Sequence, residues 1–455
     1  MDPKAHTFEF TSYNLDREKQ VVNFQYTIHF DNGSKIDLLE KLILPEQPIN
    51  YGSIPPALLD KCLQNLHLMN GVSYWKLYCP PEIRIQNNFL NKEQADFWNT
   101  IYSIGMGEFY YRNNIDFREL VHFPYLDNKG EAIPFLRSDR SLIGIGGGKD
   151  SIVAYELLKT AGEQMTGFVV SHGPEHIVVD GVVKQMGIDT LRVKRQLDKQ
   201  LTELNKRSDT YNGHVPVSAV FAFIGVLLSV LYDYSYVVVS NERSAESGNT
   251  EWKGYTINHQ WSKTLEFEIL FREYIQRWVT QDITYFSLLR PFTELKIVEL
   301  FSSYKQYFPY FSSCNRNFRI TPLRQGFEGH GKTLWCGECA KCAFVFGLLS
   351  ALIAKSELIT IFGKNLFADE KLLSMYKDLL GYGSMKPFDC VGPFEETQVA
   401  LYLASQTGEY RGDIIMDMFE KDIRPEIKNI ESLKEEEFRI GSVESIPERF
   451  RASLK

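Results

Sequence analysis

The chain has 455 residues, of which 44% are hydrophobic and 24% charged, and its formal net charge is -8. This composition is typical of a soluble globular protein with two or three domains and a sizeable core. The negative charge argues against a general nucleic-acid binder, which needs a basic surface.

Three features bear on where such a chain works. Its polar start, Met1 to His6, lacks the apolar segment of a secretory signal. The longest apolar runs, 219–231 and 342–354, are shorter than a membrane span and fit buried helices. Seven cysteines, an odd number, indicate a reducing cytosol rather than a disulfide scaffold. We therefore expect a cytoplasmic protein without a membrane segment; the sequence does not indicate its oligomeric state.

The first part of the chain, 1–138, is predicted to be an N-terminal α/β domain. Apolar residues alternate with polar ones over 22–30, which indicates a half-buried strand, and 31–34 reads Asp-Asn-Gly-Ser, a hairpin turn signal. Helical spacing follows over 56–68 and 92–104. This part carries no catalytic motif that we identify, so we assign it substrate recognition as a hypothesis.

A glycine-rich loop opens the predicted nucleotide domain, 139–355. The apolar run 142–145 leads into three glycines, then Lys-Asp-Ser and an amphipathic helical pattern. Glycine lets the backbone approach a ligand, and the unpaired N–H groups at a helix start attract anions. We expect a nucleotide phosphate site here, with Asp150 holding Mg²⁺. Its residues are Gly146, Gly147, Gly148, Lys149, Asp150 and Ser151.

Three nucleotide-binding motifs compete for this loop. A Walker A loop fails because Asp150 stands where it needs Ser or Thr and Ile143 where it needs its first Gly. The dinucleotide fingerprint fails because Lys149 replaces its third Gly. The loop resembles the PP-loop of the ATP pyrophosphatase superfamily, Ser-Gly-Gly-x-Asp-Ser, with Gly146 in place of the Ser. That resemblance implies cleavage of ATP between its α and β phosphates. A glycine-rich turn without a ligand is the remaining alternative.

The rest of the nucleotide domain alternates strands with helices. Strands are predicted at 166–171, 190–193 and 236–240, with an apolar helix at 217–231. The fold class is therefore α/β, a doubly wound parallel sheet with helices on both faces. Ligands bind such sheets at the carboxyl ends of the strands, so we expect the glycine loop, His172 and the segment after Ser240 to surround one crevice.

A polar stretch, 241–263, follows the last predicted strand. It is rich in hydrogen-bonding side chains, which a solvated surface loop also shows, but its exit at the ligand end of the sheet favours a site loop. Its candidate functional residues are Glu242, Arg243, His259 and Lys263.

Four cysteines form a second candidate site. Cys336, Cys339 and Cys342 are spaced Cys-x-x-Cys-x-x-Cys, and Cys314 supplies a fourth thiol. Four thiolates are the ligand set of a tetrahedral structural Zn²⁺ site. Buried free cysteines, a catalytic thiol and an iron–sulfur cluster are the alternatives.

Residues 356–455 have a helical period and are predicted to form a mainly helical C-terminal region. A Gly- and Pro-rich segment, 381–393, interrupts the pattern. It either folds back toward the active site or is an ordinary loop between helices.

Three blocks together resemble one family: Gly-Gly-Gly-Lys-Asp-Ser; the polar stretch with its Asn258-His-Gln-Trp-Ser-Lys263; and Ser313-Cys314-Asn-Arg-Asn-Phe with the later cysteines. They are similar to the UDP-N-acetyl-α-D-muramoyl-L-alanyl-L-glutamate epimerases (MurL). The resemblance implies an isomerase of peptidoglycan synthesis, with roles in cell wall biogenesis and cell shape, that uses ATP and Mg²⁺. Its substrate would be a UDP-linked muramoyl dipeptide, whose terminal L-Glu is inverted to D-Glu with release of AMP and pyrophosphate.

The implied chemistry needs a proton-transfer group. We favour His259 as the base, because imidazole titrates near neutral pH, with Cys314 as the thiol alternative, Glu242 as a further candidate and Lys263 steadying the adenylate. His172 and Arg243 are expected to contact the nucleotide. Two alternatives stay open: another adenylating PP-loop enzyme, either tRNA-modifying or amidating, and a nucleotide-binding regulatory module.

Overall fold

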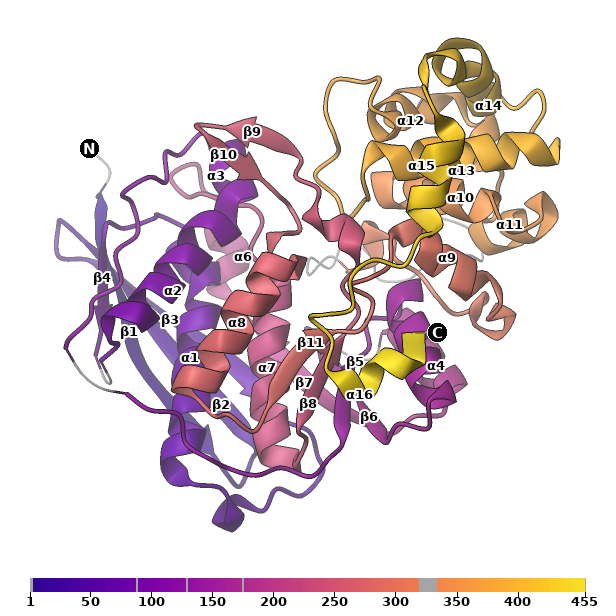
Figure 1. Cartoon of the computed structure of the whole chain (residues 1–455). Helices are drawn as coiled ribbons and strands as arrows, with labels where there is room; N and C mark the ends of the chain where they lie inside the picture. The colour runs from indigo at the N-terminus through magenta and orange to yellow at the C-terminus, as the bar shows by residue number, and fades with distance from the viewer. Residues whose placement is uncertain (1–2, 87–88, 128–129, 174–175, 319–333, 455) are drawn as a thin grey trace.

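A single nine-stranded sheet runs through the protein (Figure 1). The structure is a computed structural model that describes residues 3–86, 89–127, 130–173, 176–318 and 334–454. The strand order is β11-β8-β5-β6-β7-β3-β2-β1-β4. Neighbouring strands from β11 to β7 are all parallel, whereas β7, β3, β2 and β1 alternate in direction and β4 runs parallel to β1. The predicted α/β class with a largely parallel sheet is therefore confirmed.

The parallel half contains the strands predicted after the glycine loop, and one that the sequence did not reveal. Its five strands are β5 (Ser141–Gly144), β6 (Met165–Ser171), β7 (Thr190–Gln196), β8 (Tyr236–Val239) and β11 (Thr284–Ser287). In the centre of this half Ile143 pairs with Gly167 on one side and Val238 on the other. The loops at the carboxyl ends of β5 and β8 therefore leave the sheet side by side.

The N-terminal strands extend the same sheet. They are β1 (Ala5–Asp16), β2 (Val21–Phe30), β3 (Lys35–Ile43) and β4 (Glu82–Ile85). The predicted strand and hairpin turn are confirmed, because β2 and β3 pair antiparallel across residues 31–34. Strand β3 then pairs with β7, and the buried Glu40 and Arg195 form an ion pair of 2.6 Å across that seam. The sheet thus crosses the boundary placed at residue 138; the three-domain division itself stays a prediction.

Helices cover both faces of the parallel half, since successive strand residues enter opposite cores. Phe168 and Val237 face one core, while Val169 and Val238 face the other. The first core includes α1 (Pro56–Trp75), α2 (Lys92–Ser103), α7 (Val217–Tyr232) and α8 (Leu265–Trp278); the second includes α4 (Lys149–Thr160), α5 (Ile177–Met186), α9 (Glu294–Ser302) and α10 (Ala340–Ser350). The antiparallel half buries apolar residues in the first core alone.

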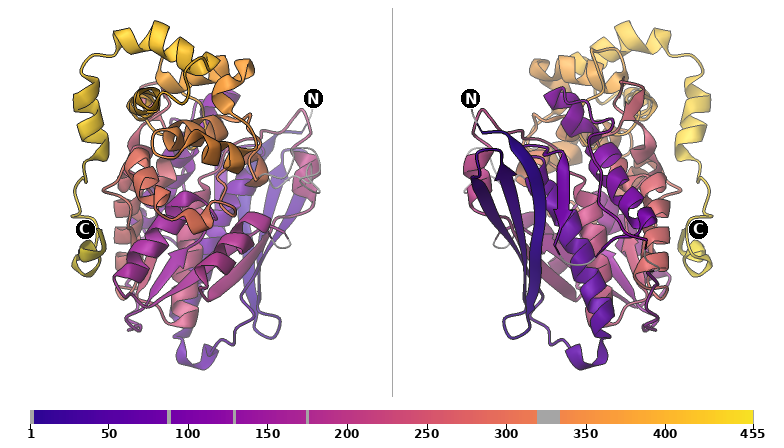
Figure 2. Two further views of the ribbon diagram at one scale, coloured as in Figure 1. Left: turned by 90° about the vertical axis from the view of Figure 1, so that its right-hand side faces the viewer. Right: turned by 90° about the vertical axis from the view of Figure 1, so that its left-hand side faces the viewer.

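The C-terminal region is helical, as predicted, and its end returns to the sheet. Its helices are α11 (Lys355–Phe362), α12 (Leu373–Leu380), α13 (Phe394–Thr407), α14 (Ile414–Met418), α15 (Ile430–Phe438) and α16 (Glu448–Arg451). After α15 the chain runs down the outside of the molecule to α16 (Figure 2). There Phe450 packs against Tyr236 of β8 and Phe286 of β11, with ring centroids 4.9 and 4.8 Å apart.

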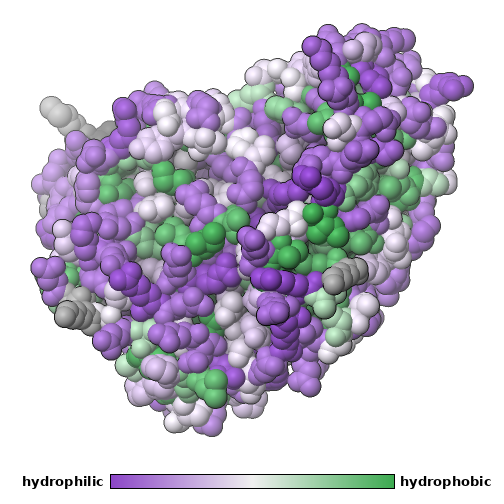
Figure 3. Space-filling view, viewed as in Figure 1, coloured by the Kyte–Doolittle hydropathy of each residue, from purple (hydrophilic) through white to green (hydrophobic). Residues whose placement is uncertain are grey.

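The remaining α-helices and strands are short. They are α3 (Gly107–Asn113), α6 (Gln200–Leu204) and the small hairpin of β9 (Thr250–Trp252) and β10 (Tyr255–Ile257). Hydrophilic residues cover most of the face seen in Figure 3, with hydrophobic residues in smaller groups between them. Among the described residues, no helix combines the length and the apolar character needed to cross a bilayer.

Candidate functional site

The glycine loop between β5 and α4 has a conformation that side chains would disturb. Gly147 has a φ of +81°, a region that L-residues other than Gly seldom adopt. A Cβ on Gly148 would lie 2.8 Å from the Ser313 Oγ, whereas a Cβ on Gly146 would meet open space. Gly148 is the N-cap of α4 and has no side chain with which to cap it. The first N–H groups of α4 therefore stay available to an anion.

The first turn of α4 carries a charge network. Lys149 is fully buried and pairs with the carboxylates of Asp150 and Glu294, and Lys341 lies 2.9 Å from the second of these. Burial opposes the charged ammonium of Lys149, yet the two carboxylates raise its pKa overall. Burial likewise opposes the Glu294 carboxylate, but the two lysines lower its pKa to about 2. Asp150 keeps part of its side chain exposed, and the Ser151 Oγ donates to the Gly148 carbonyl at 3.0 Å.

Glu242 and Lys263 lie close to this network. Burial is the main cause that raises the pKa of Glu242, and the negative charges of Glu294 and Asp150 add to it while Lys263 opposes it. The ammonium of Lys263 is stabilised by Glu242, Asp150 and Cys390, which together raise its pKa against the effect of burial. The polar stretch and the glycine loop thus lie close together, as the sequence predicted from the order of the strands.

A second set of interacting groups surrounds His259. Its Nδ1 contacts the Glu108 carboxylate, its imidazole is hydrogen-bonded to the Cys390 thiol, and the ring of His214 lies 4.5 Å away. Burial disfavours the imidazolium, but Cys390 and Glu108 raise the pKa of His259 to about 10. Burial keeps His214 neutral, with a pKa of about 3. Ligand atoms of Glu108, His214 and His259 lie within 4.8 Å of one another.

The Gly- and Pro-rich segment 381–393 folds back onto the polar stretch. The Lys386 Nζ donates to the Ser247 carbonyl at 3.0 Å, and the Asn249 Nδ2 donates to the Pro387 carbonyl at 2.7 Å. The next residues place Cys390 against His259. Of the two alternatives raised by the sequence, the structure therefore supports the return toward the site.

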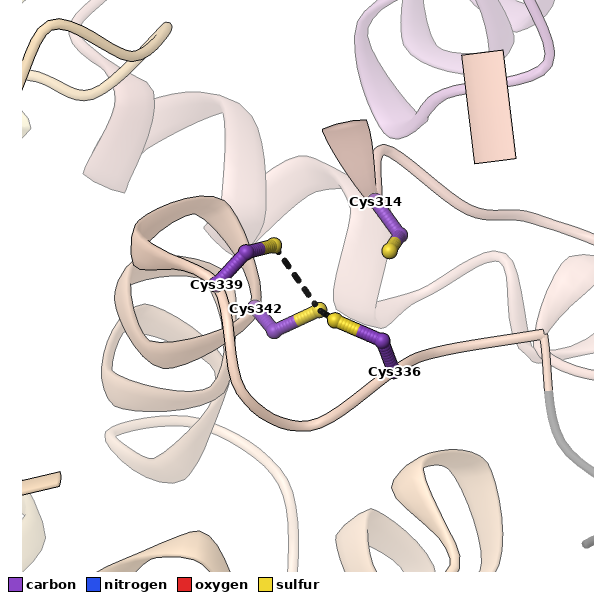
Figure 4. A group of neighbouring side chains, drawn as sticks. All are labelled: Cys314, Cys336, Cys339 and Cys342. Carbon is purple, nitrogen blue, oxygen red and sulfur yellow. Dashed lines mark hydrogen bonds between the residues drawn. The ribbon is translucent and has the colours of Figure 1, made fainter. Parts of the chain in front are cut away.

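The four predicted cysteines converge. The sulfur atoms of Cys314, Cys336, Cys339 and Cys342 all lie within 4.8 Å of one another, and none is in a disulfide (Figure 4). The Cys342 Sγ is 3.6 Å from that of Cys336 and 3.4 Å from that of Cys339. Helix α10 begins only after Cys339. Helical geometry therefore does not spread the sulfurs of Cys336 and Cys339 apart. Four thiols in this arrangement fit a tetrahedral Zn²⁺ site.

Three of the residues to which the sequence assigned nucleotide binding or proton transfer lie outside both the charge network and the group around His259. His172, at the end of β6, interacts with Arg195, and burial lowers its pKa to about 4. The Arg243 side chain points to α15, where it donates to the Glu436 carbonyl at 3.2 Å. Cys314 belongs to the cysteine cluster. The roles assigned to them in nucleotide binding and proton transfer stay predictions.

Sequence reasoning missed several groups that the fold brings to the crevice: Glu108, His214, Glu294, Lys341 and Cys390. One feature of the sequence pointed to Cys390: it stands in the Gly- and Pro-rich segment that interrupts the C-terminal helices. Glu294 had a weaker one: it follows Thr293, whose Oγ1 accepts from the Lys296 N–H as an N-cap. Glu108 and His214 carried no local signal.

The start of α4 carries groups of the kind that bind the phosphates of a nucleotide. The glycine loop presents backbone N–H groups, Gly146 leaves space beside them, and Asp150 is a partly exposed carboxylate at the same helix start. These are the groups that would bind phosphates and a Mg²⁺ ion bridging them.

The chain matches two family models, the MurL N-terminal domain over residues 1–288 and the MurL C-terminal domain over residues 310–434. It is 37% identical over 422 residues to a protein of Xanthomonas oryzae pv. oryzae, covering 92% of this chain and 90% of that one. Relatives in Micromonospora sp. and Salinispora tropica are 36% and 34% identical and share 90% of this chain, covering 89% and 87% of their own lengths. All three are named UDP-N-acetyl-alpha-D-muramoyl-L-alanyl-L-glutamate epimerase. The chain belongs to the MurL family.

Proposed function

We propose that this chain is an epimerase that inverts the terminal L-Glu of UDP-N-acetyl-α-D-muramoyl-L-alanyl-L-glutamate to D-Glu, and that it uses ATP to do so. The observation that carries the proposal is the similarity to relatives with this name over about nine tenths of the chain. The ATP requirement rests on the glycine loop at the start of α4, whose form favours a phosphate ligand.

Adenylation answers the main chemical difficulty of this inversion. An α-proton beside an ionised carboxylate resists removal, because the carbanion would add a second negative charge. A carboxylate oxygen of the substrate that attacks the α-phosphorus of ATP expels pyrophosphate and gives an acyl-adenylate, in which the carboxyl group itself no longer carries a negative charge. The α-proton is then acidic enough for a side-chain base, and water finally releases AMP and the epimer.

Each part of the crevice has a role in this proposal. The N–H groups of the glycine loop and the start of α4 bind the ATP phosphates, and Asp150 holds Mg²⁺, which neutralises charge on them. Lys149 fixes the Asp150 carboxylate through its contacts with Asp150 and Glu294. Lys263, held positively charged, stabilises negative charge on the substrate. The PP-loop type of fold is part of the same proposal.

We also propose that the cysteine cluster binds one structural Zn²⁺ ion. Its segments lie against the glycine loop: the Ser312 N–H donates to the Gly147 carbonyl at 3.2 Å, and Ser313 borders Gly148. Between Cys339 and Cys342, Lys341 reaches Glu294. A metal that ties these segments together would fix one wall of the phosphate site.

The test is to incubate the protein with ATP, Mg²⁺ and the UDP-linked dipeptide in D₂O. We expect pyrophosphate and AMP, substrate-dependent, together with deuterium at the α-carbon and a D-Glu product. Formation of ADP would contradict adenylation. Pyrophosphate without deuterium exchange would favour an amidating or tRNA-modifying ligase, and nucleotide binding without turnover would favour a regulatory module.

A further inference from the structure

One group in the crevice has no role in the proposal so far. Cys390 lies in the segment that folds back onto the polar stretch, and its thiol is hydrogen-bonded to His259. By its residue exposure Cys390 is only partly buried. Lys386 and Pro387, four and three residues before it, are hydrogen-bonded to the polar stretch and fix its position there.

The charges around Cys390 favour its thiolate. Lys263, His259 and Lys341 all interact with it and bring positive charge. Burial raises the pKa of Cys390, but these cations, Lys263 foremost, lower it to about 7 overall. A thiol with this pKa is substantially ionised at neutral pH, and the thiolate is the basic and nucleophilic form.

His259 is in the opposite state. Its imidazole contacts the Glu108 carboxylate, which favours the protonated ring, and Glu108 in turn is held by the Arg112 Nε at 2.6 Å. A ring that already carries both protons cannot accept a third, so His259 as it stands in this structure does not act as a base. It can hold a thiolate in place instead.

We propose that Cys390 is the base that exchanges the α-proton of the substrate, with His259 and Glu108 as positioning residues; this inference rests on the proposed epimerase function. The Cys390 Sγ takes the α-proton and becomes a thiol, while the C–H electron pair stays on the α-carbon and spreads into the adenylated carbonyl group. A second acid delivers a proton to the opposite face of that carbon. Glu242, a buried carboxyl group whose pKa burial raises, lies close to Lys263, and we assign it this step. In the reverse direction the Cys390 thiol returns its proton.

The first experiment compares wild-type protein with Cys390→Ser, using ATP, Mg²⁺ and the UDP-linked dipeptide in D₂O. A serine hydroxyl is not ionised at neutral pH, so α-deuterium incorporation should fall about 10²–10⁴-fold. Substrate-dependent pyrophosphate release should persist, because the glycine loop is unchanged. Met385→Ala, an exposed change in the same segment, is the matched control and should leave both activities as in the wild type.

A second experiment uses the native protein and keeps the inference testable if Cys390→Ser fails to fold. Iodoacetamide at pH 7 should modify Cys390 faster than the buried Cys62 and Cys79, as measured by peptide mass spectrometry. Deuterium incorporation should fall in proportion to the fraction of Cys390 that is modified. In His259→Asn the thiol loses a cationic partner, so the pKa of Cys390 should rise. The modification should then be slower than in the wild type at pH 7 and should recover at pH 9.

The outcomes separate this inference from the function on which it rests. A wild-type protein that makes no pyrophosphate with this substrate overturns the proposed function and its base together. An active wild type in which Cys390→Ser, or alkylated Cys390, exchanges deuterium at the full rate overturns the inference alone. Loss of pyrophosphate release in Cys390→Ser to the same extent as exchange would assign Cys390 to adenylation instead, and would also overturn it.

Discussion

The site has two parts that are built differently: the charge network at the start of α4, here called the binding wall, and the group of His259 and Cys390, here called the proton-transfer wall. On the binding wall, Lys149 and Glu294 are buried and paired, and their pKa values are displaced so far that both stay charged near neutral pH. On the proton-transfer wall His259 and Cys390 are partly exposed, and the pKa of Cys390 is about 7. A wall of fixed charge suits binding of a highly charged ligand, whereas a wall that titrates near neutrality suits proton transfer. Binding and proton transfer should therefore be separable by mutation.

The largest effect should come from Asp150→Ala on the binding wall. Loss of the proposed Mg²⁺ ligand removes several kcal/mol of charge stabilisation, so pyrophosphate release should fall by at least about 10³-fold. Deuterium exchange should fall with it, because it needs the adenylate. The control is Asp180→Asn, which changes an acidic residue in the first turn of the neighbouring helix α5. Turnover at the wild-type rate in Asp150→Ala would remove the loop from the mechanism.

Glu294→Gln should destabilise the folded protein. The change leaves Lys149 and Lys341 buried with less negative charge beside them, and breaking such a buried pair costs about 3–5 kcal/mol. The control on the same helix is Glu299→Gln, a partly exposed residue whose loss should cost at most about 1 kcal/mol. Urea unfolding at pH 7 measures both, and equal midpoints for the two variants would contradict a structural role of this network.

The same carboxylate gives a prediction for acid. The pKa of Glu294 in the folded protein is about 2, below its ordinary 4.5. Its stabilising contribution is therefore complete above about pH 4.5 and is lost as the pH falls toward 2. Over that range the free energy of unfolding should fall more steeply in the wild type than in Glu294→Gln.

Cys336→Ser tests the metal site that we propose beside the binding wall. Metal analysis of the wild type should find about one zinc ion per chain, and the variant should lose most of it with a lower Tm. Cys79→Ser, a buried cysteine outside the cluster, should keep the metal. A fully active wild type that contains no metal would leave these cysteines a packing role.

The smallest effect should come from Glu108→Gln on the proton-transfer wall. Without the carboxylate, the pKa of His259 drops from about 10 toward the ordinary range, and the ring supports the Cys390 thiolate less well. Deuterium exchange at pH 7 should fall about tenfold, the loss expected for a pKa shift of about one unit, and recover at higher pH. Pyrophosphate release should not change. The control is Glu251→Gln, a change at an exposed residue of the polar stretch. If Glu108→Gln lost deuterium exchange and pyrophosphate release equally, binding and proton transfer would not be separable.

The contrast also explains what the sequence could predict. The glycine loop is local: a strand, three glycines and a helix start stand in order, so the pattern alone predicted β5, α4 and an anion site. The cysteines were predicted from spacing and the polar stretch from the order of the strands. The pair of His259 and Cys390 was not predicted, because tertiary contacts of the 381–393 segment bring it together. Strand β11, Thr-Tyr-Phe-Ser, lacks the aliphatic run that marked the equally short β5 and β8.

The position of the N-terminal strands has a consequence for synthesis on the ribosome. Helix α1 buries its apolar residues partly against α7, and β3 pairs with β7, yet both partners are translated much later. At 5–20 residues per second, α1 would wait on the order of ten seconds for α7. During that time a nascent chain exposes the apolar face of α1, which is a surface for chaperones to bind and for other chains to aggregate on. A fragment that stops at residue 138 should therefore be poorly soluble, although it contains a complete antiparallel meander.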